Sequence, residues 1–363
     1  MENMGIETVL KKKYSGKKIL ITGHTGFKGS WLISALNFLG AEIRGYSLHP
    51  DKDSLFNLMH CDKVCQSVFA DIRAQEKLEY EITQFQPDFI FHLAAQSLVR
   101  PSYSDPAYTF EVNSMGTVNV LNSIRKLTKP CVVIVVTTDK VYENREINYS
   151  YQENDSLGGY DPYSASKACA EIIASSFRRS FFNAENYNEH KKSVATARAG
   201  NVIGGGDWAK DRIIPDLINS LTQKKAVKIR NPGSIRPWQH VLDGLSGYLL
   251  LGAKIAGDPV RYSEAWNLGP KDNDTLTVLE LVGHAIKMWG TGKYECVNTD
   301  DQPHEASLLK LDSTKAMKHL GWVPKYDSRT GIMLTIEWYR KVLVEKISPA
   351  DITLTQIKSY FSI

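Results

Sequence analysis

The chain has 363 residues, carries a net charge of +4 and contains ordinary fractions of charged and apolar residues. This length favours one large domain or two smaller domains over a minimal fold. The basic runs are short and separate, at 11–13, 178–179, 191–192 and 224–225. We therefore interpret them as solvated faces and expect no nucleic-acid partner.

The composition also restricts the cellular setting. No apolar run approaches the roughly 18 residues that a membrane span needs, and the N-terminus lacks the apolar core of a signal peptide. The five cysteines are odd in number and show no zinc spacing. We expect a cytoplasmic protein with reduced thiols, no membrane association and no metal site.

Short apolar runs alternate with longer helical patterns through the first 200 residues. The expected strands cover residues 17–23, 41–48, 68–72, 88–96, 131–138 and 194–200. The expected helices cover residues 30–40, 78–86, 109–127 and 162–182. Strands that are apolar throughout and alternate with helices predict an α/β fold, in which a parallel sheet is covered on both faces.

The segment GHTGFKG joins the first expected strand to the first expected helix. Gly23 permits a tight turn, Gly26 lets the backbone approach a pyrophosphate, and Gly29 lets the helix pack on the strand. The helix N-terminus then offers free N–H groups and a partial positive charge to the phosphates. This pattern predicts a dinucleotide site formed by Gly23, His24, Thr25, Gly26, Phe27, Lys28 and Gly29.

The loop departs from the usual dehydrogenase pattern. Its spacing, G-x-x-G-x-x-G, is one residue longer than G-x-G-x-x-G, and Lys28 either faces the phosphates or points to solvent. An acid that holds the ribose 2′-hydroxyl of NAD is expected about 20 residues further on. That position falls near His49, with Asp51 and Asp53 just beyond and no Arg for a 2′-phosphate. The residues leave NAD and NADP open, and we favour NAD.

The alternation of apolar strands and helices becomes less regular beyond residue 200, where Gly, Pro and Trp are frequent. Two helices are expected there, near 276–289 and 329–346. Together with the glycine loop, this predicts a Rossmann-type doubly wound parallel sheet with a smaller C-terminal substrate-binding lobe. We assign the dinucleotide-binding domain to 1–200 and the lobe mainly to 201–363. The boundary is interleaved, because 194–200 still has the pattern of a core strand.

Tyr163 and Lys167 lie four residues apart on an expected helix, and hence on one helix face. A phenol with a pKa near 10 is a poor base at neutral pH, but a nearby ammonium group favours the phenolate. We expect Lys167 to lower the pKa of Tyr163, which can then accept a hydroxyl proton while a hydride leaves the same carbon. Such a pair can also arise by chance on the protein surface, but here a glycine loop precedes it by about 140 residues.

These residues resemble the short-chain dehydrogenase/reductase superfamily, in its extended branch that acts on nucleotide sugars. The resemblance covers nearly the whole chain and includes HLAAQ (92–96), VNSMGTVNVL (112–121), TTDK (137–140) and YSASK (163–167). It implies that the adenine is contacted by Asp71 and Ile72, and that the cofactor is further lined by Ala94, Ala95, Gln96, Tyr163 and Lys167. It implies that the sugar side of the site includes Gln96, Asn113 and Thr138.

Within this branch the chain resembles the dehydratases that act on CDP-glucose. The matching stretches are GGYDPYSASK, AGNVIGGGDWAKDR, IRNPGSIRPWQHV and GPKDNDT. Thr138 stands where that family usually has Ser, and Val141 where it usually has Cys. The resemblance implies NAD as cofactor, CDP-glucose as substrate, a role in deoxysugar and O-antigen synthesis, and a homodimer or higher homo-oligomer formed through helices 109–127 and 162–182.

The stretch VVTTDKVYENRE places Asp139 and Lys140 at the end of an expected strand, where open parallel sheets bind ligands. The reaction that the resemblance implies oxidises C4 of the sugar, eliminates water across C5 and C6, and returns the hydride to C6. The elimination needs a base for C5 and an acid for the C6 hydroxyl. We assign Asp139 as the acid and Lys140 as the base, which must be uncharged when it acts. Alternatively, Lys140 stays charged and stabilises the enolate, or the two residues are a surface ion pair.

Two arginines in the predicted lobe suit the binding of a nucleoside diphosphate. The guanidinium fork of Arg212 or Arg236 matches phosphate oxygens, and Asn201 is expected to reach the sugar or the phosphates. Trp208 or Trp238 either stacks on the base or packs in the core. These residue types do not distinguish cytosine from another pyrimidine.

Two other classes of function remain open from the residues. A 4-epimerase needs the pair Tyr163 and Lys167 but not the acid and base at 139–140, and a dehydratase for another nucleotide sugar would share all four residues. A non-catalytic dinucleotide sensor is disfavoured because Tyr163 and Lys167 are both present.

Overall fold

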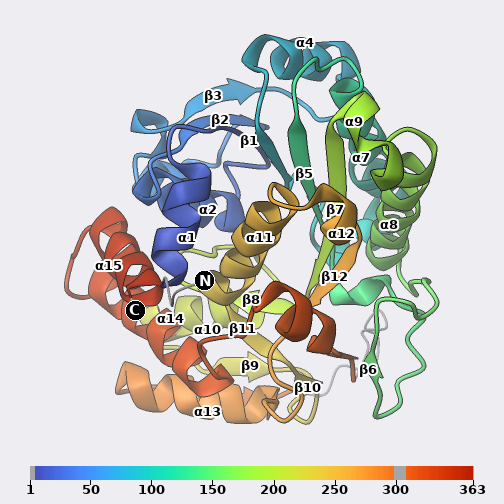
Figure 1. The fold of residues 1–363 in the computed structure, drawn as a ribbon. Coiled ribbons are helices and arrows are strands. Elements are labelled where there is room, and N and C mark those ends of the chain that lie inside the picture. The colour runs from blue at the N-terminus through green and yellow to red at the C-terminus, as the bar shows by residue number, and fades with distance from the viewer. Residues whose placement is uncertain (1–4, 298–307, 363) are drawn as a thin grey trace.

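The structure is a computed structural model that describes residues 5–297 and 308–362. Its centre is a sheet of seven parallel strands in the order β12–β7–β5–β4–β1–β2–β3 (Figure 1). The strands of this sheet are β1 (Lys18–Thr22), β2 (Glu42–Ser47), β3 (Gln66–Phe69), β4 (Phe89–His92), β5 (Cys131–Val136), β7 (Lys192–Ala199) and β12 (Ala265–Leu268). The chain winds one way from β1 to β3 and the other way from β4 to β12, as in a doubly wound sheet.

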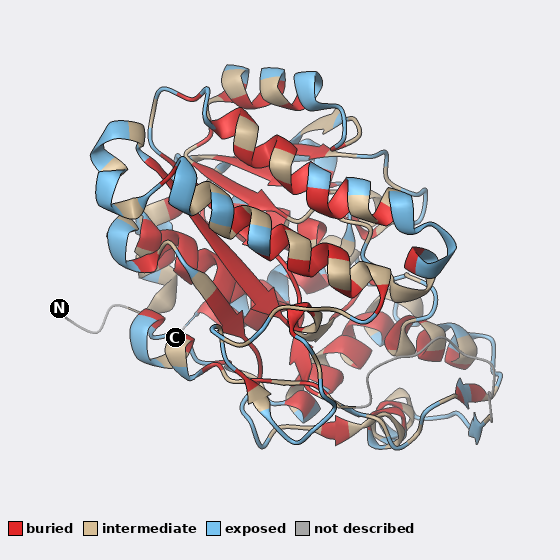
Figure 2. Cartoon of the chain, turned by 90° about the vertical axis from the view of Figure 1, so that its right-hand side faces the viewer, coloured by how far each residue is buried: buried red, intermediate tan, exposed pale blue. Residues whose placement is uncertain are grey.

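The apolar strands feed two cores because successive side chains point to opposite faces. On β1, Ile19 and Ile21 join the core on one face, and Leu20 joins the core on the other. One face is covered by α1 (Ile6–Tyr14), α2 (Phe27–Phe38) and α11 (Val241–Ile255), and the other by α4 (Gln75–Phe85), α7 (Gly116–Ile124) and α8 (Pro162–Ser180). Figure 2 shows the buried sheet between these helices, whose exposed residues lie on the outer surface.

The second part of the chain forms a smaller lobe beyond the carboxyl ends of the strands (Figure 1). Its elements are β8 (Asn201–Ile203), α10 (Ile213–Thr222), β9 (Val227–Ile229), β10 (Ile235–Arg236), β11 (Trp238–His240), β13 (Leu276–Thr277), α13 (Val278–Trp289), β14 (Tyr294–Cys296) and α14 (Ser328–Leu343). The last helix, α15 (Pro349–Phe361), packs against α14 and α2.

Short elements complete the connections. They are α3 (Leu55–Leu58), η1 (Cys61–Lys63), α5 (Val99–Ser104), α6 (Pro106–Phe110), η2 (Glu111–Met115), η3 (Asp139–Val141), β6 (Ser150–Tyr151), η4 (Ala184–Asn186), α9 (Tyr187–His190), α12 (Pro259–Tyr262), β15 (Lys310–Leu311) and η5 (Ala316–Leu320). Within the described residues, no helix combines the length and the apolar character that crossing a membrane requires.

The fold confirms the predicted Rossmann-type doubly wound sheet, with two differences in detail. The single helix expected over 109–127 is divided by η2, a π-helical turn in which Asn113 bonds both Gln96 and Ser166. In addition, α11 and β12 come from beyond residue 200 and pack on or pair within the large sheet. The chain therefore crosses between the sheet and the lobe more than once.

A buried ion pair joins three elements near the carboxyl end of the sheet. Arg198 on β7 donates to Glu171 on α8 over 2.8 Å, and the two side chains are only 4% and 1% exposed. Glu171 also accepts from the hydroxyls of Thr137, directly after β5, and Thr196, over 2.5 and 2.7 Å. These contacts fix α8 relative to β5 and β7.

Removing one partner of this ion pair should lower the free energy of unfolding more than replacing both partners with apolar residues. The variant Glu171→Leu leaves Arg198 charged and unpaired in the core, so we expect a loss of about 3–5 kcal/mol in the free energy of unfolding. The double variant Glu171→Leu/Arg198→Met removes both charges and should lose less than the single variant. Chemical denaturation of both proteins measures the difference. A loss below about 1 kcal/mol in the single variant would show that the pair does not hold these elements together.

Candidate active site

A cavity of about 590 Å³ lies between the carboxyl ends of the strands and the smaller lobe. Its lining on the sheet side follows β1, β2, β3, β4, β5 and β7 in turn. The lobe contributes residues from the segments 207–216, 228–238 and 278. In a doubly wound sheet, ligands bind in this crevice where the winding direction reverses, which here is between β1 and β4.

The glycine loop lines this cavity. Two of its glycines stand at positions where the backbone leaves no room for a side chain. Gly23 has φ +74°, and a Cβ atom there would lie 2.6 Å from the backbone nitrogen of Ala94. A Cβ on Gly29 would lie 2.3 Å from the carbonyl oxygen of Gly23, so α2 can begin against the loop only without a side chain there. Gly26 caps α2, and the first residues of the helix line the cavity. The loop thus has the close backbone packing on which the sequence-based prediction of a phosphate site rests.

Lys28 and His24, the two unusual occupants of the loop, differ in direction. Lys28 lines the cavity, and burial together with the charge of Arg212 lowers the pKa of Lys28 to about 8. His24 turns away from the cavity and packs on the backbone of β2, where a Cβ atom on Gly45 would meet the imidazole at 2.2 Å. Burial lowers the pKa of His24 to about 4, and its Nε2 lies 3.0 Å from the Ser67 hydroxyl. His24 therefore shapes the loop from behind.

Tyr163 and Lys167 lie on the first turns of α8, which begins with Pro162 after an Asp161 cap. Both side chains line the cavity beside Thr138. The ammonium of Lys167 donates to the carbonyl of Val136, the last residue of β5, over 3.1 Å. The phenol of Tyr163 shares a hydrogen bond with Thr138. The helix thus presents the pair at the end of β5.

The pKa of Tyr163 is raised, whereas the sequence led us to expect that Lys167 lowers it. Burial raises the pKa of Tyr163 to about 12, and the Thr138 hydrogen bond offsets only part of this rise. Lys167 is itself buried, and burial together with the charge of Lys28 lowers its pKa to about 8. Desolvation is therefore the largest cause of the pKa shift of each group.

Asp139 and Lys140 begin η3, which two residues separate from the end of β5, and line the same cavity as Tyr163. Asp139 is 2% exposed and accepts a hydrogen bond from the Thr138 hydroxyl over 2.8 Å. Its other oxygen, Oδ2, has no hydrogen-bond partner among the described residues. A Cβ atom on Gly200 would lie 3.2 Å from this oxygen, so the glycine leaves space beside it. Lys140 is half-buried. The two residues are part of the cavity wall and not a solvated pair.

The opposite side of the cavity carries several positive charges. Arg212 donates to Asp207 over 2.9 Å and to the Ser97 hydroxyl over 3.3 Å. Arg100 and Arg230 each lie 3.3 Å from the same oxygen of Asp211. The guanidinium groups on this side have the planar fork that matches the oxygens of a phosphate group.

Most predicted site residues meet in this cavity. Its lining includes Gly23, Thr25, Gly26, Phe27, Lys28, Gly29, Asp71, Ile72, Ala94, Ala95, Thr138, Asp139, Lys140, Tyr163, Lys167, Asn201, Arg212 and Arg236. Three others, all described by the structure, lie outside the lining: His24, Gln96 and Asn113. Gln96 bonds Leu98 and Thr109, and Asn113 clamps the backbone of Gln96 to Ser166, so both support the wall from behind.

The tryptophans divide between core and surface. Trp238 lines the cavity but is buried, and its indole N–H donates to the carbonyl of Leu276 over 3.3 Å. Trp208 lies outside the cavity lining, packs edge-on against Tyr339 and is partly exposed. Neither has its ring free in the manner that stacking on a base requires in this conformation.

Sequence reasoning missed Ser47, Arg100, Asp211 and Arg230. Ser47 ends β2, the strand end where an acid is usual, and its hydroxyl lies 2.8 Å from that of Thr25. Arg230 stands within the stretch RNPGSIRPWQH, which drew attention for other residues. Arg100 could have been found only from its place shortly after a strand end, a weak signal without the fold.

Comparison with known proteins agrees with this geometry. Residues 20–335 match the family model described as GDP-mannose 4,6 dehydratase. The chain is 46% identical over 331 residues to the CDP-glucose 4,6-dehydratase of Salmonella typhimurium, and the match covers 91% of this chain and 92% of that protein. It is 26% identical to the CDP-paratose 2-epimerase of Salmonella typhi, over 88% of this chain and 98% of that protein.

Solved structures agree in fold. A dTDP-glucose 4,6-dehydratase from Streptomyces venezuelae with NAD bound superposes with a TM-score of 0.76 at 25% identity, covering 89% of this chain and 97% of that chain. The UDP-glucose 4-epimerase of Thermotoga maritima gives a TM-score of 0.76 at 24% identity, over 90% and 99%, which supports the fold alone. The chain belongs to the GDP-mannose 4,6-dehydratase family of the extended short-chain dehydrogenase/reductase superfamily.

Proposed function

We propose that this protein is an NAD-dependent CDP-glucose 4,6-dehydratase, which converts CDP-D-glucose to CDP-4-dehydro-6-deoxy-D-glucose and water. The observation that carries the proposal is the meeting of Tyr163, Lys167, Asp139 and Lys140 in one cavity beside a glycine loop. The relative at 46% identity supports the nucleotide sugar, and the NAD-bound dehydratase structure supports the cofactor.

The glycine loop fits the pyrophosphate of a dinucleotide. The missing side chains at Gly23 and Gly29 leave the backbone and the first amides of α2 open to the phosphates. Asp71 and Ile72 would hold the adenine end, and Ala94 and Ala95 would line the other half. Bound there, NAD would supply a hydride acceptor for C4 of the sugar and the hydride that returns to C6, which makes the reaction redox-neutral overall.

The residues on α8 and at the end of β5 perform the proton transfers. Tyr163 accepts the proton of the C4 hydroxyl, which Thr138 orients through its own hydroxyl. The protonated amine of Lys167, one turn away on α8, favours the phenolate form of Tyr163. The ketone at C4 then makes the proton at C5 acidic.

Asp139 and Lys140 serve the elimination. Lys140 accepts the C5 proton as its uncharged amine, and Asp139 donates a proton to the departing C6 hydroxyl. The buried Oδ2 of Asp139, beside the space that Gly200 leaves, is the oxygen available to the substrate. A 4-epimerase would not use this pair, so its presence in the cavity favours the dehydratase.

The wider setting follows from the same proposal. Arg212, Arg236 and Asn201 hold the diphosphate and sugar within the lobe 201–363, opposite the dinucleotide-binding domain 1–200. The protein acts in the cytoplasm in deoxysugar and O-antigen synthesis. It forms a homodimer through the helices near 109–127 and 162–182, where exposed apolar side chains include Met115, Ile172 and Phe181.

The substrate is tested by incubating the protein and NAD with CDP-glucose, and in parallel with dTDP-, UDP- and GDP-glucose. We expect the alkali-induced ultraviolet absorbance of a 4-keto-6-deoxy sugar with CDP-glucose alone. A signal with another nucleotide would change the assigned substrate. If the protein bound NAD but produced no signal with any of the sugars, the dehydratase proposal would be wrong.

The lowered pKa of Lys28 leads us to expect that the affinity for NAD depends on pH. Because its pKa is lowered to about 8, chiefly by burial, Lys28 is charged below this pH and loses its charge above it. Bound phosphates favour the charged form, so NAD affinity should be constant below about pH 8 and then fall by up to about tenfold per pH unit. Titrations between pH 6 and 9.5 measure this slope.

The matched variant is Lys28→Met, which keeps the apolar stem and removes the charge. It should bind NAD more weakly at pH 7 and lose the slope above pH 8. A wild-type affinity that stays constant to pH 9.5 would contradict a phosphate contact by Lys28. A slope that persists in Lys28→Met would belong to another group, of which Lys167 is the first candidate.

A further inference from the structure

The segment after β3 forms one wall of the cavity at the end distant from Tyr163. Ala70, Asp71 and Ile72 line this wall, and Tyr108 and Val112 line the wall across from it. In a doubly wound fold, the half of the sheet from β1 to β3 binds the adenosine half of a dinucleotide. These two walls therefore enclose the space that an adenine ring would enter.

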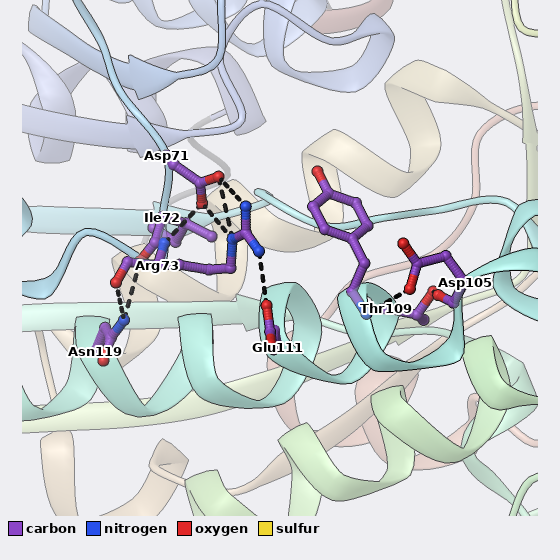
Figure 3. Close-up of polar contacts among 8 residues, drawn as sticks. Asp71, Ile72, Arg73, Asp105, Thr109, Glu111 and Asn119 are labelled. Atoms are coloured by element: carbon purple, nitrogen blue, oxygen red, sulfur yellow. Dashed lines mark hydrogen bonds and ion pairs between the residues drawn. The ribbon is translucent and has the colours of Figure 1, made fainter.

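Arg73 bridges the two walls, although it follows the lining residues and is itself exposed. Its guanidinium donates to both oxygens of Asp71, with Nε 3.1 Å from Oδ1 and Nη2 2.8 Å from Oδ2. Its Nη1 donates to Glu111 on η2 over 2.6 Å. The guanidinium also lies over the ring of Tyr108, 4.8 Å from its centre. Figure 3 shows Asp71, Arg73 and Glu111 joined in this row.

The backbone beneath this row is held separately. Asn119 on α7 donates to the carbonyls of Ile72 and Arg73 over 3.1 and 3.3 Å, as Figure 3 also shows. Tyr46 donates to the carbonyl of Asp71 over 3.0 Å. These three bonds position the backbone whether or not the Arg73 side chain is present. The backbone N–H of Arg73 also donates to Oδ1 of Asp71 over 2.9 Å, and the Arg73 side chain adds the bonds that hold both oxygens of the carboxylate.

The charge state of that carboxylate follows from the same contacts. The hydrogen bonds from Arg73 are the main cause that lowers the pKa of Asp71 below its usual range. An ionised carboxylate only accepts hydrogen bonds. A fixed acceptor at the rim of an adenine space would select a ring that offers a donor there, such as the 6-amino group of adenine.

We propose that Arg73 is a positioning residue for cofactor selection: by binding Asp71 on one side and Glu111 and Tyr108 on the other, it fixes the carboxylate that recognises the 6-amino group of adenine. This inference rests on the proposed NAD site. It adds a residue that touches neither the sugar nor the nicotinamide but sets the preference for an adenine dinucleotide.

The test compares the affinities of wild type and Arg73→Met for NAD and for nicotinamide hypoxanthine dinucleotide, which carries a carbonyl in place of the 6-amino group. We expect the wild type to prefer NAD by about tenfold, the magnitude of one well-placed hydrogen bond to a charged group. Arg73→Met should lose most of this preference, chiefly by binding NAD more weakly. Glu111→Gln, which weakens only one side of the bridge, should lie between the two.

Two controls separate positioning from loosened structure. Arg261→Met removes another exposed arginine that lies over a tyrosine, Tyr262, away from the cavity, and should behave as wild type. Nicotinamide mononucleotide lacks the adenosine half. Its dissociation constant, measured by competition with NAD, should be the same for Arg73→Met and for the wild type.

The results distinguish this inference from the cofactor proposal. If Arg73→Met and Glu111→Gln kept the wild-type preference, or lost affinity equally for both dinucleotides, the positioning role would be wrong while NAD binding stood. If Arg73→Met did not fold, Glu111→Gln alone would decide. If the wild type bound neither dinucleotide, the cofactor proposal itself would fail, and the role of Arg73 with it.

Discussion

The ion pair between Arg198 and Glu171 is the contact on which the catalytic edge of the sheet depends. It lies in the core, where an unpaired charge would be costly, and it ties α8 to β7 and, through the Thr137 hydroxyl, to the end of β5. Residue 138 follows Thr137 directly, and Lys167 lies one turn before Glu171 on α8. A polar contact in an apolar core therefore sets the relative position of the residues to which we assign proton transfer.

Charge is concentrated around the phenol of Tyr163. Burial and then the charge of Lys28 lower the pKa of Lys167, and burial and then the charge of Arg212 lower the pKa of Lys28. Such a cluster is unfavourable by itself, because burial and like charges both oppose it. The same cluster favours ligands that bring negative charge, and two diphosphates are the negative groups that the proposed cofactor and substrate would bring.

Local patterns predicted much of the fold and the loop chemistry. The strands β1 and β5 are largely apolar runs, and the requirement for Gly23 and Gly29 is a matter of backbone space, which residue identity reveals directly. The strand β12 was missed because four residues in a glycine-rich region carry little pattern, and only pairing with β7 defines it. His24 and Arg73 were beyond sequence reasoning because the direction of each side chain depends on neighbours distant along the chain.

We propose that different residues of one cavity carry out the oxidation and the elimination. The variant Lys140→Met tests this most directly. The protein is mixed with NAD and CDP-glucose, and reduced nicotinamide and the 4-keto-6-deoxy product are followed together. Since Tyr163 and Lys167 remain in place, we expect reduced nicotinamide to form slowly and accumulate while the product is absent. If the variant lost both signals together, or made product at the wild-type rate, this division of labour would be contradicted.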